Sequence, residues 1–170
     1  MLKEEDIQRA LLLYTKIDIL INNVGGGGRW GKEDPVITKE EVWTQVYNKN
    51  ADIARRFTIN TLPYMLKKRW GRVITIASYL GKEGIGRPWF MMAKAAEIAL
   101  MKSLANHYRG SGVTFNSVAP GAIAIPDTAN ETEGGKPEDV AYLVSFLCSD
   151  KASYISGACI GLDGGTSRSF

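Results

Sequence analysis

Hydrophobic and polar positions along the chain alternate between the spacing of amphipathic helices and short apolar runs. Residues 4–14 carry apolar side chains at helical spacing, and the apolar run 17–21 after them is typical of a buried parallel strand. Further along, the pattern predicts helices at about 38–68, 89–108 and 137–147, and strands at 72–77, 113–118 and 158–162. Strands that alternate with helices predict an α/β fold, with one parallel sheet covered by helices on both faces.

Local signals predict the ends of the longest helix. Thr38 and Glu41 have the spacing of a capping box, so we expect each side chain to bond the other residue's backbone amide. Pro63 predicts a kink inside this helix, because proline has no amide hydrogen to donate. Gly71 predicts the C-terminal stop.

Composition narrows the classes of function. The 170 residues suffice for a single domain, residues 1–170, and 45% of them are hydrophobic, as in globular proteins. The net charge of +3 is too small to indicate a nucleic-acid partner. The charged N-terminus is unlike a signal peptide, and no apolar run approaches the ~20 residues that span a membrane. Cys148 and Cys159 lack the spacing of metal ligands, so we expect a cytoplasmic protein without a metal site.

Small and polar residues stand where the predicted strands end. Asn22-Asn23-Val24-Gly25 follows the first strand, Ser78 follows the second, and Pro120-Gly121 follows the third. In parallel sheets, ligands bind at the carboxyl ends of the strands. We therefore expect a binding site at this edge.

Taken in order, these motifs together with Asn50 and Lys94 resemble the short-chain dehydrogenase/reductase family. The resemblance covers nearly the whole chain and includes the ending Asp163-Gly164-Gly165. Each motif alone is weakly specific, whereas their order and spacing together are specific. The resemblance implies a Rossmann-like, doubly wound sheet that binds NAD or NADP and reduces a small carbonyl compound or oxidises an alcohol.

The resemblance also implies a role for each matching residue. Ser78 would polarise the carbonyl, Lys94 would hold the nicotinamide ribose and lower the pKa of a tyrosine, and Asn50 would position a water. Hydride transfer to a carbonyl leaves an oxyanion that needs a hydrogen-bond donor and a proton, which explains this set. The residues expected to line the cofactor are, on the adenosine side, Asn23, Val24 and Gly25, and, on the nicotinamide side, Pro120, Gly121 and Ile123.

Three departures from the family pattern bear on activity. The position of the catalytic tyrosine, four residues before Lys94, holds Phe90, which has no hydroxyl. Tyr79 follows Ser78, but on an extended strand it would point to the opposite side. The opening β-α-β unit with its glycine-rich phosphate turn has no counterpart, and residues 126–136 form a shorter substrate lid than is usual in the family.

Residues 26–32, Gly-Gly-Gly-Arg-Trp-Gly-Lys, nearly spell the phosphate-binding loop of nucleoside triphosphatases. That loop ends in Ser or Thr after the lysine, where this chain has Glu33, followed by Asp34 and Pro35. Two carboxylates would repel a triphosphate, and Pro35 hinders a helix that continues directly. We therefore interpret the segment as a loop that borders the mouth of the site.

Two functions follow from these observations. The first is an oxidoreductase of this family, impaired by Phe90. The alternative is a non-catalytic binding or oligomerisation module. In either case we expect a dimer or tetramer through the helices that bear Asn50 and Lys94, because small residues there permit close approach of helices. The residues expected at this interface are Tyr47, Ala51, Ala54, Thr58, Ala95, Ala99 and Leu100. Neither the substrate nor the direction of reaction follows from these residues.

Overall fold

The computed structural model describes residues 3–124 and 134–169 of the chain. Four parallel strands form one sheet in the order β1-β2-β3-β4. Their bounds are Ile19–Asn22 for β1, Gly71–Ile76 for β2, Val113–Pro120 for β3 and Cys159–Leu162 for β4. This arrangement confirms the predicted α/β, Rossmann-like fold.

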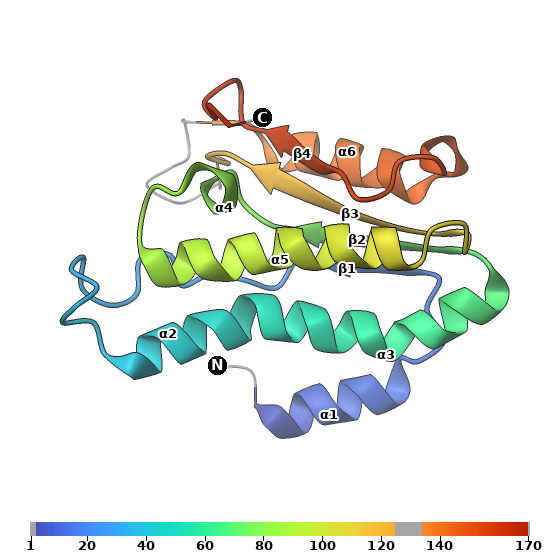
Figure 1. Ribbon diagram of the computed structural model, residues 1–170, viewed down its shortest axis with the longest axis horizontal. Coiled ribbons are helices and arrows are strands. Elements are labelled where there is room, and N and C mark those ends of the chain that lie inside the picture. The colour runs from blue at the N-terminus through green and yellow to red at the C-terminus, as the bar shows by residue number, and fades with distance from the viewer. Residues whose placement is uncertain (1–2, 125–133, 170) are drawn as a thin grey trace.

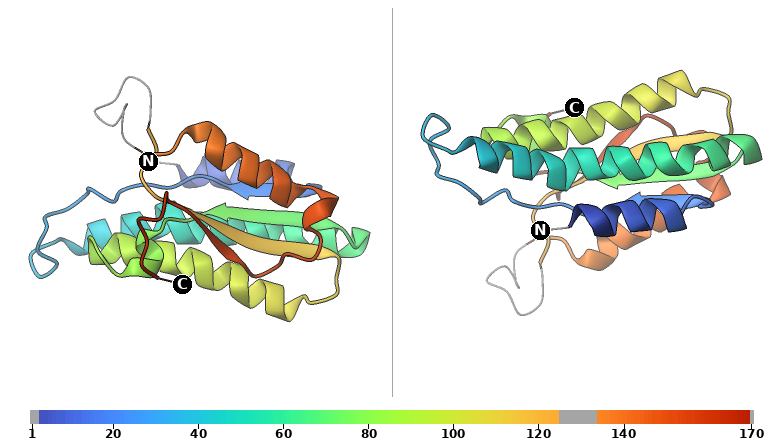
Figure 2. Two further views of the ribbon diagram at one scale, coloured as in Figure 1. Left: turned by 90° about the horizontal axis from the view of Figure 1, so that it is seen from above. Right: turned by 90° about the horizontal axis from the view of Figure 1, so that it is seen from below.

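Helices cover the two faces of the sheet (Figures 1 and 2). One face carries α2 (Glu40–Tyr47), α3 (Ile53–Lys68) and α5 (Pro88–His107), and the other carries α6 (Pro137–Cys148). Helix α1 (Glu4–Leu13) lies beside α3. An ion pair between Glu4 and Arg56 joins the two helices, as does a hydrogen bond from the Asn60 side chain to the Leu11 carbonyl. Short segments complete the chain: η1 (Asn48–Asp52), α4 (Leu80–Glu83) and η2 (Asp150–Ala152).

Alternate residues of the central strands build two cores, one on each face. Val73 and Phe115 face α3 and α5, where they pack against residues that include Met65 and Met101. Ile74 and Val118 form the opposite core with Val144 and Leu147 of α6. The central strands are thus buried on both faces, as is typical of a parallel sheet.

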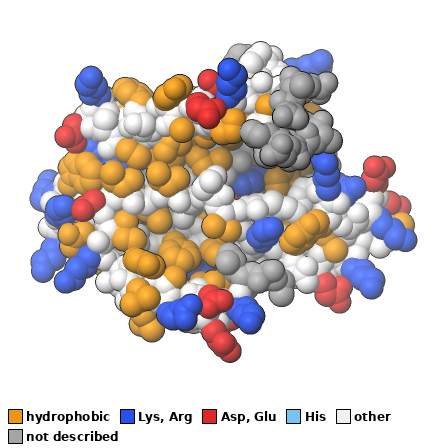
Figure 3. Space-filling view, turned by 180° about the vertical axis from the view of Figure 1, so that it is seen from behind, with side chains coloured by type: hydrophobic (Ala, Val, Ile, Leu, Met, Phe, Trp, Pro, Cys, Tyr) orange, Lys and Arg blue, Asp and Glu red, His pale blue; other side chains and the backbone are white. Residues whose placement is uncertain are grey.

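Strand β1 is the edge strand of the described sheet. Its Ile19 and Ile21 pair with Arg72 and Ile74, and they therefore lie on the face that carries α6. Both isoleucines remain exposed, by 39% and 45%. Figure 3 shows apolar side chains gathered over that side of the molecule.

The residues predicted to begin and to stop the long helix are wrong, although its end at residue 68 is as predicted. Helix α2 begins at Glu40 with Lys39 as its N-cap, and Thr38 instead donates from Oγ1 to the carbonyls of Lys32 and Asp34 at 3.0 and 2.9 Å. The turn that follows the glycine-rich loop, residues 25–31, thus brings carbonyl acceptors within reach of Thr38. Helix α3 ends at Lys68, and Gly71 already begins β2.

The reason for glycine at position 71 is close packing. A Cβ there would lie 2.7 Å from the side chain of Met65, so β2 and α3 approach too closely for any larger residue. The left-handed residue at the end of α3 is Arg69, with φ of 55°.

The expected interface is also partly wrong. Ala51, Ala54 and Thr58 are buried within one chain, since η1 and the start of α3 pack inward. Along the same two helices, the positions that remain exposed include Tyr47, Met92, Ala95 and Ala99.

Candidate functional site

Asn50 is buried in η1, a π-helical turn between α2 and α3. Its Nδ2 donates to the carbonyls of Gly26 and Val46 at 2.8 and 2.7 Å, and its Oδ1 accepts from the Gly26 amide at 3.0 Å. The side chain therefore ties down both backbone groups of Gly26. Asn50 thus holds the start of the glycine-rich loop, residues 25–31, and π-helical turns often mark functional positions.

Lys94 points from α5 to the carboxyl end of β2. Its Nζ donates to the carbonyl of Ile76 and to Oε2 of Glu97, each at 3.0 Å. Lys94 and Glu97 are only 5% and 1% exposed, so Lys94 is not a solvated surface lysine. Burial raises the pKa of Glu97 to about 7, although the Lys94 cation acts in the opposite direction.

Gly25 separates these two side chains. A Cβ at this position would lie 2.7 Å from Asn50 Oδ1 and 3.1 Å from Lys94 Nζ. Only glycine leaves room for both groups. The structure thus brings together, at the carboxyl ends of β1 and β2, three of the predicted site residues: Gly25, Asn50 and Lys94.

Ser78 and Phe90 are close in the sequence to parts of this cluster, two residues after the end of β2 and four residues before Lys94. Ser78 is half-buried just past the end of β2, where its Oγ accepts a hydrogen bond from the Leu80 amide at 3.3 Å. Phe90, in the first turn of α5, places its ring 5.8 Å from Lys94 Nζ. Tyr79 caps α4 in a helical conformation, so its predicted place on an extended strand is wrong.

The glycine-rich loop lies across Phe90. A Cβ at Gly28 would contact the Phe90 ring at 3.4 Å, so the loop backbone packs on the ring. Arg87 donates from Nη1 to the carbonyls of Trp30 and Gly31, at 2.9 and 3.0 Å, and anchors the loop to the start of α5. The next helix begins only at Glu40, which excludes the geometry of a triphosphate-binding loop. The loop instead borders the site.

The remaining predicted cofactor residues occupy the neighbouring strand ends. Asn23 and Val24 are exposed after β1. Pro120 ends β3, the Gly121 amide donates to the Leu162 carbonyl at 3.0 Å, and Ile123 pairs with Gly135. A groove of about 700 Å³ borders this segment. Most of the predicted lid at 126–136 lies outside the described residues.

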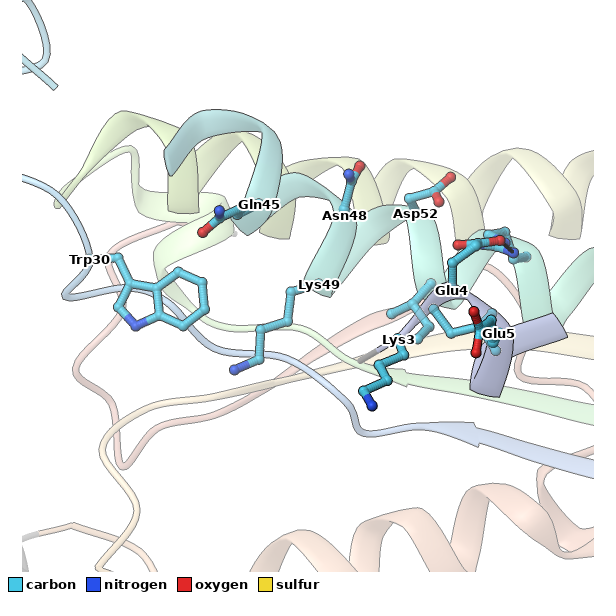
Figure 4. Close-up of a pocket in the computed structure, with 11 residues that line it drawn as sticks. Lys3, Glu4, Glu5, Trp30, Gln45, Asn48, Lys49 and Asp52 are labelled. Carbon is cyan, nitrogen blue, oxygen red and sulfur yellow. Dashed lines mark hydrogen bonds and ion pairs between the residues drawn. The ribbon is translucent and has the colours of Figure 1, made fainter. Parts of the chain in front are cut away.

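A second groove lies away from Ser78, Phe90 and Lys94. It measures about 670 Å³ and separates the start of α1 from α2, η1 and α3 (Figure 4). Trp30 closes one end, and Lys49 Nζ stands 4.8 Å from the centre of its ring. The groove therefore meets the predicted site through two elements, the glycine-rich loop with Trp30 and η1, which carries Asn50.

Glu97 is a residue of the site that was not predicted from the sequence. The signal was a carboxylate three residues after Lys94, on a helix face that is otherwise apolar. Residues at this spacing are neighbours on a helix surface. A charged residue in a buried stripe needs a partner, and Lys94 is the cation within reach.

Neither a metal cluster nor a membrane span emerges from the described residues. Residues 3–124 and 134–169 hold no group of three or more His, Cys, Asp or Glu side chains that could bind a metal ion. None of the helices in these ranges is both long and apolar enough to cross a membrane. Cys148 and Cys159 are free and half-buried, and burial raises the pKa of both thiols.

Comparison with known proteins identifies the family. The family model described as enoyl-(acyl carrier protein) reductase matches residues 4–167. The 3-oxoacyl-(acyl-carrier-protein) reductase FabG of Thermotoga maritima is 34% identical over 95% of this chain and 71% of its own length. The chain belongs to the short-chain dehydrogenase/reductase family. The FabG protein of Aquifex aeolicus is 35% identical, over 97% of this chain and 73% of its own length.

Solved structures agree with this assignment. An oxidoreductase of the family from Burkholderia thailandensis superimposes with a TM-score of 0.82 and 28% identity, over 95% of this chain and 68% of its own. An actinorhodin polyketide ketoreductase solved with NADPH has the same fold, with a TM-score of 0.82 and 23% identity, over 95% of this chain and 72% of its own. The lineage of the chain is therefore that of the family's oxidoreductases.

Proposed function

We propose that the site formed by Asn50, Ser78 and Lys94 is that of an NAD(P)-dependent carbonyl reductase whose turnover Phe90 impairs. The observation that carries this proposal is the buried cluster of Gly25, Asn50 and Lys94 at the carboxyl ends of β1 and β2. This cluster lies beside Ser78, whose hydroxyl could donate a hydrogen bond to a substrate carbonyl oxygen. The names of the Thermotoga and Aquifex relatives suggest a 3-oxoacyl compound as the substrate class.

The residues present fit the ribose end of a nicotinamide dinucleotide. Lys94 uses two of its three N–H groups on Ile76 and Glu97, which leaves one for a ribose hydroxyl. Gly25 supplies space that a Cβ would fill, 3.1 Å from Lys94 Nζ. The dinucleotide would supply the hydride. Beside it, we assign Asn23 and Val24 to the adenosine side and Pro120, Gly121 and Ile123 to the nicotinamide side. Gly25, predicted on the adenosine side, would instead adjoin the nicotinamide ribose because it lies next to Lys94.

Phe90 limits the chemistry because it cannot donate a proton to the developing alkoxide. General acid catalysis typically contributes about 10²–10⁴-fold to a rate. The three ring atoms nearest to the Gly28 Cβ position are Cγ, Cδ1 and Cε1. The para carbon, where a hydroxyl would attach, is not among them, and this favours a tolerated Phe90→Tyr substitution.

Phe90→Tyr tests the proposal. With NADPH and a 3-oxoacyl thioester, we expect this variant to turn over about 10²–10⁴-fold faster than the wild type. Phe146→Tyr adds the same hydroxyl to a 44% exposed side chain of α6 and should change nothing. A wild type that is already fast, together with no gain in Phe90→Tyr, would indicate another acid such as Tyr79. No turnover in any variant would favour the alternative, a non-catalytic binding or oligomerisation module.

We also propose that the protein is cytoplasmic. We further propose that it forms a homodimer or tetramer, with the exposed positions of α2 and α5 at the interface. Tyr47, Met92, Ala95 and Ala99 offer small and apolar side chains there. A shallow groove of about 470 Å³, which includes Tyr47 and Met92 in its lining, runs between these helices. A two-fold axis is the commonest symmetry for such a contact.

A further inference from the structure

Glu97 is a buried ionisable group that the proposed mechanism does not use. It lies on α5 one turn after Lys94, and it is 1% exposed. The hydrogen bond from Lys94 Nζ to its Oε2 measures 3.0 Å. Among the described groups, Lys94 is the charge that acts on this carboxyl group.

Either member of this pair would be costly to bury alone. Removing one partner of a buried ion pair is strongly destabilising, because the other charge is left uncompensated. The two groups therefore hold each other in the interior. Since the Ile76 carbonyl takes another N–H of Lys94, the ammonium group has little freedom, and its position at the end of β2 depends on Glu97.

Phe90 makes this dependence stronger. In the family pattern, the lysine stabilises the anionic form of a neighbouring tyrosine, so the two share charge. Here the neighbour is an uncharged ring, 5.8 Å from Lys94 Nζ. The remaining polar neighbour, Asn50, lies on the other side of Gly25 and is also uncharged. Glu97 is thus the negative charge that faces Lys94.

We propose that Glu97 is a positioning residue for Lys94: its carboxyl group orients the ammonium group and sets the net charge of the site. This inference rests on the proposed function for its consequence in catalysis. Because burial raises the pKa of Glu97 to about 7, the pair changes its net charge near neutrality. Above that pH the pair is neutral. Below it, protonated Glu97 no longer places a negative charge opposite Lys94, and the pair carries a net positive charge next to Gly25.

Carbon-13 NMR of the side-chain carboxyl groups tests the coupling in the full chain. Glu97→Gln assigns the resonance, because it removes only that signal and keeps the side-chain volume. We expect a midpoint near pH 7 in the wild type and a higher midpoint in Lys94→Met, in which the cation that lowers the Glu97 pKa is missing. A midpoint that does not move in Lys94→Met would overturn the proposal, because the two groups would then not be coupled. If Glu97→Gln fails to fold, the Glu97 resonance can still be recognised as the carboxyl signal with a raised midpoint that shifts between the wild type and Lys94→Met. This shift tests the coupling equally well.

A second measurement separates this inference from the proposed function. Turnover of NADPH with a 3-oxoacyl thioester should change in the wild type with a midpoint near pH 7, and this midpoint should vanish in Glu97→Gln. A profile that keeps the midpoint in Glu97→Gln would show that Glu97 does not set the state of Lys94. If no protein turns over at any pH, the proposed function fails, while the NMR titration still decides whether Glu97 and Lys94 are coupled.

Discussion

Replacing Gly25 by alanine would place a methyl group between the two polar side chains at the centre of the site. The new Cβ would lie 2.7 Å from Asn50 Oδ1, closer than real Cβ contacts allow, and 3.1 Å from Lys94 Nζ. Lys94 is held by Ile76 and Glu97, so Asn50 must move. Its movement would break the pair of hydrogen bonds, 2.8 and 3.0 Å long, that it makes with Gly26.

The expected cost follows from those bonds. A hydrogen bond contributes about 0.5–1.5 kcal/mol net, and leaving a buried polar group unsatisfied costs about 1–3 kcal/mol. We therefore expect Gly25→Ala to lower the free energy of unfolding by about 2–3 kcal/mol. Urea denaturation followed by tryptophan fluorescence measures this change. Hydrogen exchange should show the Gly26 amide exchanging faster, because its acceptor on Asn50 has moved away.

Gly161→Ala is the matched control. Its Cβ would meet only Asp163 Oδ2, at 3.6 Å, an ordinary contact. Such a substitution, at a glycine whose backbone suits alanine, changes stability by less than about 1 kcal/mol and usually in the favourable direction. If Gly25→Ala were as stable as Gly161→Ala, with an unchanged Gly26 amide, the packing of Asn50 against Lys94 would not be as tight as argued.

Four further outcomes are expected. Because the pKa of Glu97 is raised to about 7 in the fold and one pKa unit is worth about 1.36 kcal/mol, the protein should be more stable below pH 4.5 than at pH 8 by up to about 3 kcal/mol. Urea titrations should show this contribution to the free energy of unfolding lost as the pH rises through 7. The contribution should be absent from Glu97→Gln. Glu83 accepts bonds from the Ser167 hydroxyl and the amides of Arg168 and Ser169, so Glu83→Ala should speed exchange of those two amides without unfolding the domain. Ala99→Arg should convert an oligomer to a monomer in light scattering, and an oligomer that persists would place the interface elsewhere, with the β1 edge the first candidate. Calorimetry should show NADPH bound more weakly than about 1 μM, roughly −8 kcal/mol, since the glycine-rich loop of the described residues does not run directly into a helix N-terminus that could hold a pyrophosphate.

The strands and the long helices could be predicted because their signals are local. The runs at 17–21 and 113–118 are β1 and β3 to within a few residues, although Ile19 and Ile21 of β1 are exposed where the sequence predicts a buried strand. Pro137 begins α6 as the sequence indicates. The placing of Asn23, Ser78 and Pro120-Gly121 at one edge rests on the rule that the carboxyl ends of parallel strands meet there, whereas Asn50 and Lys94, which lie on helices, are indicated only by the family resemblance.

Other features depend on contacts between distant segments and were not predictable in this way. Thr38 has the spacing of a cap, yet the carbonyls of the preceding turn compete for its hydroxyl. Ala51 and Ala54 look like interface residues by size alone, but their burial depends on how η1 turns against α5. A small residue suits an interface between chains and a close contact within one equally well, so composition cannot distinguish them.

Glu97 shows most clearly why the rest of the site required the structure. In the sequence it is one carboxylate among the 18 acidic residues of the chain, and the resemblance assigns it nothing. In the fold it is 1% exposed and bonded to the lysine that the resemblance assigns to catalysis. A chain that had lost all use for Lys94 could replace the buried pair by apolar residues at little or no cost in stability. The presence of the pair next to Phe90 is therefore better explained by a continuing requirement for a positioned charge than by packing alone.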